Sequence, residues 1–137
     1  MEKLTPGGML AVQIPLTQQA VFYKLLHELI QADKWEMLNE IHNFHNLTPN
    51  ATYDVLAVCS GEVAMWETLY YHVVPSHSAV IDWYKGSGLK PYLDALGENE
   101  KTEFLGELLE AVKGNIPIQG DGNVILKMPR LFFTAKK

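Results

Sequence analysis

The sequence predicts an α+β domain in which three strands and about six helices form a three-stranded mixed sheet with helical connections. Three segments are rich in apolar, β-branched and aromatic residues, at about 9–14, 62–74 and 130–136, and longer stretches with helical periodicity separate them. The 137-residue length suits one domain, and no internal repeat or linker divides it. We therefore expect a single domain over 1–137, with a helical insertion at 76–114.

The first strand is expected at residues 10–14, from Leu10 to Ile14. It is apolar at nearly every position, which is typical of a strand covered on both faces. Thr17 can cap a helix that continues to about Ala32, because apolar residues recur there at helical spacing. A second helix is expected over 34–45.

Thr48 and Pro49 predict the start of the next helix, since Thr is a good cap and Pro suits the first helical position. Helical spacing then places Tyr53, Leu56 and Ala57 on its inner face.

Residues 62–74 form the longest strand candidate, because apolar and aromatic side chains alternate along it. Ser76 can cap the first helix of the insertion, and an amphipathic helix is expected over 98–113, with Gly114 as its terminator. Pro129 cannot donate to a ladder, so we expect it to separate an approach segment from the last strand.

Composition excludes several classes of protein. Hydrophobic residues make up 47%, charged residues 20%, and the net charge is −5, so neither a disordered chain nor a nucleic-acid-binding surface is expected. No apolar run is long enough to span a membrane. The single cysteine, Cys59, cannot form an internal disulfide, which fits a cytoplasmic protein.

A Leu-x-Pro-Gly-Gly turn, with Pro6, Gly7 and Gly8, introduces the first strand. This turn resembles the one before the fifth strand of the class I S-adenosylmethionine-dependent methyltransferase fold. The order of strand, helices, strand, inserted helices and strand is similar to the C-terminal half of that Rossmann-like fold.

Five further blocks narrow the resemblance to the trans-aconitate methyltransferase group. They occur in the right order over nearly the whole chain, at 66–72, 75–77, 81–83, 88–93 and 129–132. The resemblance implies methyl transfer from S-adenosylmethionine to one carboxylate of a small polycarboxylic acid. An ionised carboxylate is already a nucleophile and needs alignment rather than a base, so no catalytic residue is assigned.

The resemblance and the residue types suggest candidate substrate-binding residues. Each also has a structural interpretation: packing for the aromatic residues, a solvated lysine, and an ion pair for the single arginine. Lys90 stands where the group often has arginine, so it keeps the charge without the bidentate fork. The candidates are Tyr70, His72, Trp83, Lys90 and Arg130.

The cofactor of the full-length family is S-adenosylmethionine, bound by a Gly-x-Gly-x-Gly turn after the first strand. The two glycine-rich segments here, 86–88 and 120–122, lack the third glycine and the preceding strand. We therefore expect no cofactor to bind this chain alone. His42 and His45 have no clear third ligand, so no metal site is expected.

A missing cofactor-binding half would leave the apolar strand at 10–14 with an open edge, which is a template for pairing with another chain. We expect a homodimer through this edge or through the helix after it. Three functions remain open: a methyltransferase fragment inactive alone, a stand-alone module that binds a small carboxylic acid, or a protein-interaction module.

Overall fold

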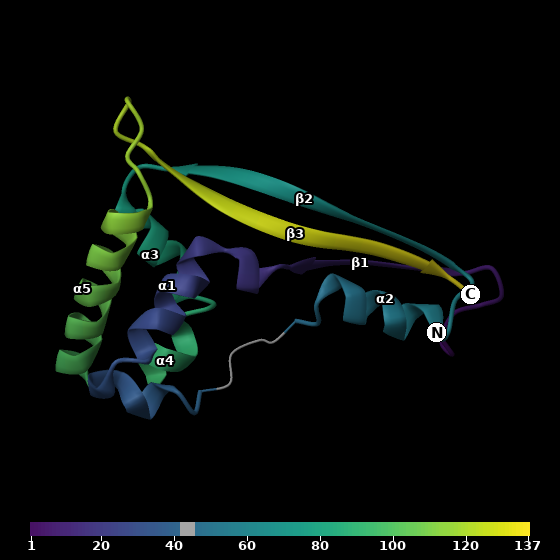
Figure 1. Ribbon diagram of the computed structural model, residues 1–137, viewed down its shortest axis with the longest axis horizontal. Coiled ribbons are helices and arrows are strands. Elements are labelled where there is room, and N and C mark those ends of the chain that lie inside the picture. The colour runs from purple at the N-terminus through teal and green to yellow at the C-terminus, as the bar shows by residue number, and fades with distance from the viewer. Residues whose placement is uncertain (42–45) are drawn as a thin grey trace. The chain divides into compact units, whose positions relative to one another are not determined.

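The structure is a computed structural model that describes residues 1–41 and 46–137 (Figure 1). It confirms the α+β class, with three strands joined by helices. The elements are β1 (Met9–Pro15), η1 (Thr17–Gln19), α1 (Val21–Ile30), η2 (Asp33–Leu38), α2 (Pro49–Ala57), β2 (Glu62–Val74), α3 (His77–Lys85), α4 (Lys90–Asp94), α5 (Glu98–Asn115) and β3 (Val124–Lys136), where η marks a 3₁₀ helix.

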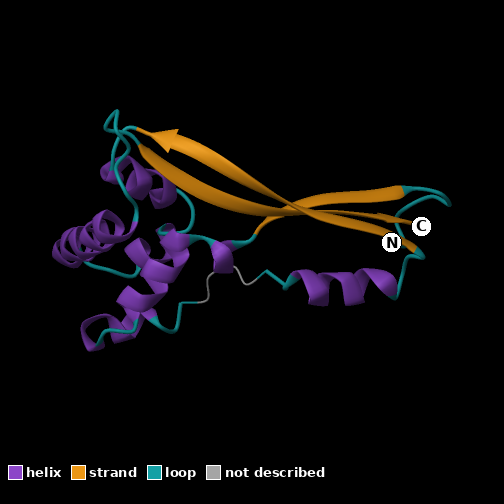
Figure 2. Ribbon diagram, turned by 45° about the horizontal axis from the view of Figure 1, so that its top comes forward, coloured by secondary structure: helices purple, strands orange, loops and turns teal. Residues whose placement is uncertain are grey.

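The strands form one sheet in the order β1-β3-β2, so the last strand lies in the middle (Figure 2). β3 runs antiparallel to β1, with Met9 opposite Lys136 and Pro15 opposite Arg130. β2 also runs against β3, since Glu62 at the start of β2 forms an ion pair with Lys136 at 3.2 Å. Both neighbouring pairs are antiparallel, so the sheet is antiparallel and not the mixed sheet expected from sequence.

Pro129 does not divide the last strand, contrary to the expectation from sequence. β3 continues through it because the Pro129 carbonyl accepts a hydrogen bond from Leu16 N at 3.0 Å, on the side of β1. The N–H that proline lacks would point to the same side, toward Leu16, just beyond the last paired residues Pro15 and Arg130. Its absence therefore removes only the reciprocal bond at the end of the ladder with β1 and none toward β2.

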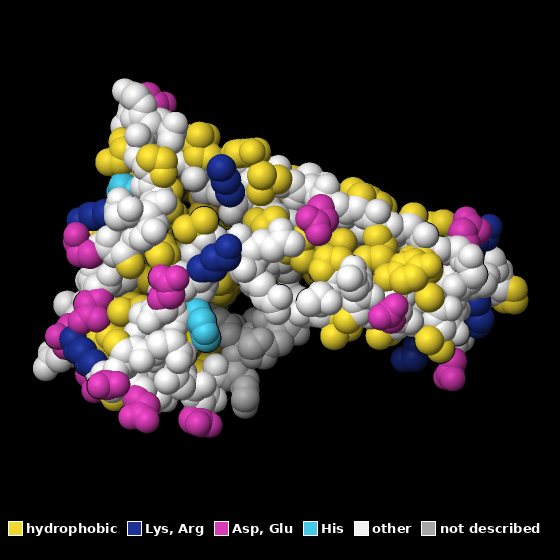
Figure 3. Space-filling view, in the orientation of Figure 1, with side chains coloured by type: hydrophobic (Ala, Val, Ile, Leu, Met, Phe, Trp, Pro, Cys, Tyr) yellow, Lys and Arg dark blue, Asp and Glu magenta, His cyan; other side chains and the backbone are white. Residues whose placement is uncertain are grey.

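One compact unit comprises residues 1–17, 46–70 and 128–137 of the described chain. Its core contains Leu56 of α2 and alternate residues of β3, namely Leu131, Phe133 and Ala135, together with Leu16. β1 alternates between half-buried and exposed residues, so the prediction that both its faces are covered is wrong. Hydrophobic side chains are visible over the strands of this unit in Figure 3.

Helix α2 begins where the sequence predicts, but a different face of the helix is buried. Thr48 Oγ1 accepts a hydrogen bond from Ala51 N at 3.2 Å, and Pro49 is the first helical residue. Thr52 and Leu56 are the buried residues, while Tyr53 and Ala57 are exposed, so the inner face is turned by about one residue from the predicted one.

A second compact unit comprises residues 18–41 and 71–127 of the described chain, and holds α1, η2, α3, α4 and α5. Its core is aromatic. The rings of Phe22 and Tyr84 stack with centroids 3.7 Å apart, and Trp35 meets Phe104 edge to face at 5.1 Å. Edge-to-face pairs of this kind stabilise a core beyond the apolar area they bury.

Three helix boundaries differ from the predicted ones. α1 begins at Val21 after the short 3₁₀ turn η1, not at a Thr17 cap. A 3₁₀ helix, η2, stands where a helix over 34–45 was expected; residues 42–45 of that range lie outside the described chain. Gly114 lies inside α5, because the last turn continues to Asn115. No helix in the described chain has both the length and the apolar content needed to cross a membrane.

Candidate functional site

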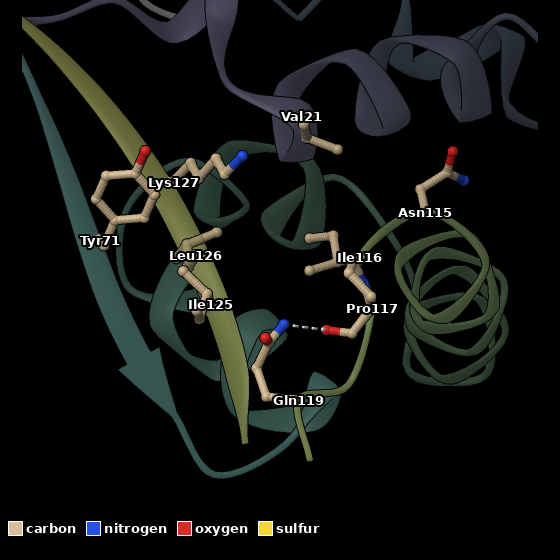
Figure 4. A pocket seen from close by; sticks show the side chains of 9 residues that line it. All are labelled: Val21, Tyr71, Asn115, Ile116, Pro117, Gln119, Ile125, Leu126 and Lys127. Atoms are coloured by element: carbon tan, nitrogen blue, oxygen red, sulfur yellow. Dashed lines mark hydrogen bonds between the residues drawn. The ribbon is translucent and has the colours of Figure 1, made fainter. Parts of the chain in front are cut away.

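The second unit contains a pocket of about 320 Å³ beside the start of β3 (Figure 4). β3 supplies one wall, β2 contributes a tyrosine, and α1, the end of α5 and the segment after it supply the rest. The lining residues are Val21, Tyr71, Asn115, Ile116, Pro117, Gln119, Ile125, Leu126 and Lys127.

The segment after α5 is fixed by local interactions. Pro117 follows the helix closely, where a residue without an N–H cannot continue it. The carbonyl of Ile116 accepts a hydrogen bond from His77 Nε2 at 2.7 Å, and His77 is buried. Ile118 then forms an isolated antiparallel bridge with Val124. The segment after α5, which forms the pocket wall opposite β3, is therefore fixed at both of its ends.

The turn from this segment into β3 is also well defined. Gly122 adopts φ +87°, which favours glycine, and Gln119 N donates to Asn123 O at 2.8 Å. Hydrogen bonds from the Asn123 backbone and side chain lower the pKa of Asp121. The turn places Ile125 to Lys127 at the pocket wall.

The pocket combines an apolar wall with one cation. Val21, Ile116 and Leu126 supply the apolar surface. Lys127 Nζ lies 5.9 Å from the centre of the Tyr71 ring. In the part of the chain that is described, no carboxylate lies within ion-pair distance of Lys127, so its charge is not neutralised by the protein. This arrangement suits a small anion with a hydrocarbon part.

None of the five predicted substrate-binding residues lines this pocket. Two of them are brought together elsewhere in the same unit: the rings of His72 and Trp83 lie 5.0 Å apart with a tilt of 41°. Trp83 is 48% exposed and therefore not a core residue. Tyr70 precedes His72 on β2 and is exposed.

The two predicted cationic residues have different partners. Lys90 forms an exposed ion pair with Asp94 at 2.7 Å, one helical turn along α4. Arg130 faces Gln13 of β1, whose amide oxygen, when turned toward the guanidinium, accepts from Nη1 at 3.0 Å and Nε at 3.3 Å. The structural interpretation of Arg130, an ion pair with an acidic residue, is not found among the described residues, where its guanidinium faces a neutral amide.

The glycine-rich segments lie where a cofactor turn would not be expected. Residues 86–88 connect α3 to α4, and residues 120–122 lie between α5 and β3, so neither segment follows a strand. Groups of three potential metal ligands are not found among the described residues. His42 and His45 lie outside that set.

Sequence reasoning missed Tyr71, Gln119 and Lys127 as residues of one site. Tyr71 lies between the candidates Tyr70 and His72, and strand alternation sends its side chain to the opposite face. A signal for Lys127 was present, because it is a single charge among the otherwise apolar residues 124–129. Strand alternation alone could not show that this side chain lies beside a pocket.

Comparison with known proteins places this geometry in context. The chain is 37% identical to a trans-aconitate 2-methyltransferase of Escherichia coli O157:H7 over 135 residues, which is 98% of this chain. It is 34% identical over 140 residues to the enzyme of that name from Sinorhizobium fredii, and 38% identical over 135 residues to the one from Klebsiella pneumoniae. The chain resembles the trans-aconitate methyltransferases along its whole length.

The match covers different shares of this chain and of its relatives. The chain spans about half the length of the curated relatives it matches, 52% of the E. coli protein and 54% of the S. fredii protein. No family model matches the chain. Because nearly all of this chain is aligned, the pocket lies in the part that is shared with trans-aconitate methyltransferases.

Proposed function

We propose that this chain is the substrate-binding part of an S-adenosylmethionine-dependent methyltransferase that acts on a carboxylate of a small polycarboxylic acid. The observation that carries the proposal is the similarity of the whole chain to trans-aconitate 2-methyltransferases about twice its length. The pocket at Lys127 supports it, because a cation beside an apolar wall suits an acid with a short hydrocarbon frame.

The described residues do not fit the methyl donor. A nucleotide-type cofactor needs a close backbone approach at a glycine turn that follows a strand, and both glycine-rich segments here lie elsewhere. We therefore propose that this chain holds and orients the acid and does not bind S-adenosylmethionine by itself. The exposed free thiol of Cys59 supports a reducing compartment such as the cytoplasm.

The test is a complementation assay with labelled S-adenosylmethionine and trans-aconitate. We expect no methyl ester from the chain alone, and ester formation when the unmatched half of the E. coli relative is added as a separate polypeptide. Ester formation by the chain alone would show that it does hold the donor. If the mixture is inactive and calorimetry also detects no trans-aconitate binding to the chain, the proposed function is wrong.

A second candidate, association of two copies, is favoured by the edge of β1. Gly8 O accepts from Lys137 N at 2.9 Å, and Leu16 N donates to Pro129 O, so even-numbered residues of β1 face β3. The backbone groups of Ala11 and the other odd-numbered residues face outward, and no described strand pairs with them. We propose that this edge pairs with the same edge of a second copy.

A further inference from the structure

The edge of β3 that faces β1 has a gap in its backbone hydrogen bonding at Lys127. In a strand, the N–H and C=O of one residue point to the same side, and successive residues alternate. Pro129 O accepts from Leu16 N on this side, and Asn123 O accepts from Gln119 N in the turn that precedes β3. Ile125 and Lys127 lie between these two positions and share their side of the strand. The antiparallel bridge of Ile118 with Val124 directs the Ile125 N–H at the carbonyl of Pro117, so the gap is at Lys127.

The gap opens into the pocket. Pairing with β1 ends at Arg130, and the bridge from the segment after α5 ends at Val124. Figure 4 shows β2 on one side of β3 and the side chains of Ile116 and Val21 on the other. The backbone N–H and C=O of Lys127 therefore face the pocket, and no backbone partner for them is found among the described residues at this edge.

We propose that this gap binds a single carboxylate group. One oxygen accepts from a backbone N–H of the strand edge, the other accepts from the ammonium of Lys127, and the hydrocarbon part packs on Val21, Ile116 and Leu126. The proposal deepens the proposed function, since it assigns the subsite that anchors one carboxylate of the acid. Binding at this subsite does not itself require methyl transfer.

The composition of the edge favours a carboxylate over a doubly charged anion. The carbonyl oxygens of Ile125 and Lys127 lie on the same edge as the Lys127 N–H. These oxygens repel a phosphate dianion, which one lysine cannot neutralise. A carboxylate carries one charge and matches the one cation, and an uncharged amide of the same shape lacks the ion pair with Lys127.

The first test is NMR of the backbone amides. In the free protein we expect fast hydrogen exchange at Lys127 and slow exchange at Leu126, whose N–H faces β2. Trans-aconitate and 3-methylbutanoate should shift the Lys127 amide, whereas 3-methylbutanamide and inorganic phosphate should shift it much less. Equal exchange at both positions, or phosphate binding as tight as carboxylate binding, would overturn the proposal.

The second test uses variants. Lys127→Met should weaken binding of 3-methylbutanoate by about tenfold or more, as expected for a lost charged hydrogen bond. Lys113→Met removes an exposed lysine of α5 outside the pocket and should leave the affinity unchanged. If Lys127→Met binds as well as the parent, the site is not the one proposed.

Carboxylate binding without methyl transfer in the complementation assay would count against the proposed function alone.

Discussion

Trp35 Nε1 donates a hydrogen bond to Glu107 Oε2 at 2.8 Å, which ties η2 to α5. The indole is buried against Phe104, while the carboxylate remains partly exposed and also contacts Lys34. Hydrogen bonds from Lys34 and Trp35 lower the pKa of Glu107. A buried donor and a surface carboxylate together fix the position of η2 on the helical unit.

Replacing Glu107 should destabilise the protein to a degree that depends on whether the new side chain can still accept the hydrogen bond from Trp35 Nε1. Glu107→Leu leaves the indole N–H without its acceptor, which costs about 1–3 kcal/mol. Glu107→Gln keeps an acceptor and loses only the charge, so we expect a loss below about 1 kcal/mol. Urea unfolding followed by tryptophan fluorescence measures both, and equal losses in the two variants would contradict the role of the hydrogen bond.

The Glu107 carboxylate should make the stability of the protein depend on pH. Because the folded-state pKa of Glu107 is lowered, its contribution is fully present above the unfolded pKa of about 4.5 and is lost as the pH falls through the folded value. The advantage of the parent over Glu107→Gln should therefore shrink on going from about pH 6 to about pH 3. Melting temperatures of both proteins across this range provide the measurement, and a constant difference would argue against a charge effect.

His77 should be needed to hold the start of α3 to the end of α5. Its Nε2–H donates to the carbonyl of Ile116, and both residues are buried. His77→Ala should cost about 1–3 kcal/mol, because a buried carbonyl loses its donor. His77→Gln can still donate through its amide and should recover part of the loss. Thermal unfolding separates the two variants, and a His77→Ala protein as stable as the parent would refute the assignment.

Gly88 should tolerate no side chain, whereas Gly86, two residues earlier, should. A Cβ at Gly88 would lie 3.0 Å from Cζ of Tyr23, whose ring meets Tyr84 edge to face at 5.4 Å. Gly88→Ala must displace this aromatic cluster and should destabilise by about 1–3 kcal/mol. Gly86→Ala has open space and a negative φ, so it should be neutral or slightly stabilising. Similar melting temperatures for both variants would contradict the close approach.

Association through β1 predicts a specific response to proline. Ala11→Pro removes an N–H that points away from β3, so it should dissociate the proposed homodimer without loss of secondary structure. Val12→Pro removes a bond to β3 and should unfold this part of the sheet. Sedimentation equilibrium at tens of micromolar measures the first effect. A parent protein that is already monomeric at that concentration would exclude pairing of two copies through this edge.

The sequence predicted the strands better than the faces that they present. Residues 62–74 were assigned to β2 with the bounds that the structure has, because alternation over thirteen positions is a strong local signal. The interruption predicted at Pro129 was wrong, since whether a missing N–H matters depends on which side of the strand it faces. That side is fixed by pairing with β1, more than a hundred residues away in the chain.

In the candidate site, too, the sequence indicated residue types but not their partners. Lys90 and Arg130 could be selected as cations from sequence, but their partners, Asp94 and Gln13, are visible only in three dimensions. Lys127 was overlooked because a lysine on a strand is usually a solvated residue. Its place beside a pocket depends on the turn that brings the segment after α5 back toward β3.

By itself, the sequence determined the α+β class, the order of the strands and helices along the chain, and the resemblance to trans-aconitate methyltransferases, because each depends on local periodicity or on ordered blocks of residues. Only the tertiary structure decided which strand lies in the middle, which edge of β3 is left without a partner, and which charges are neutralised. These features depend on contacts between residues far apart in the chain, and local propensities carry no information about such contacts.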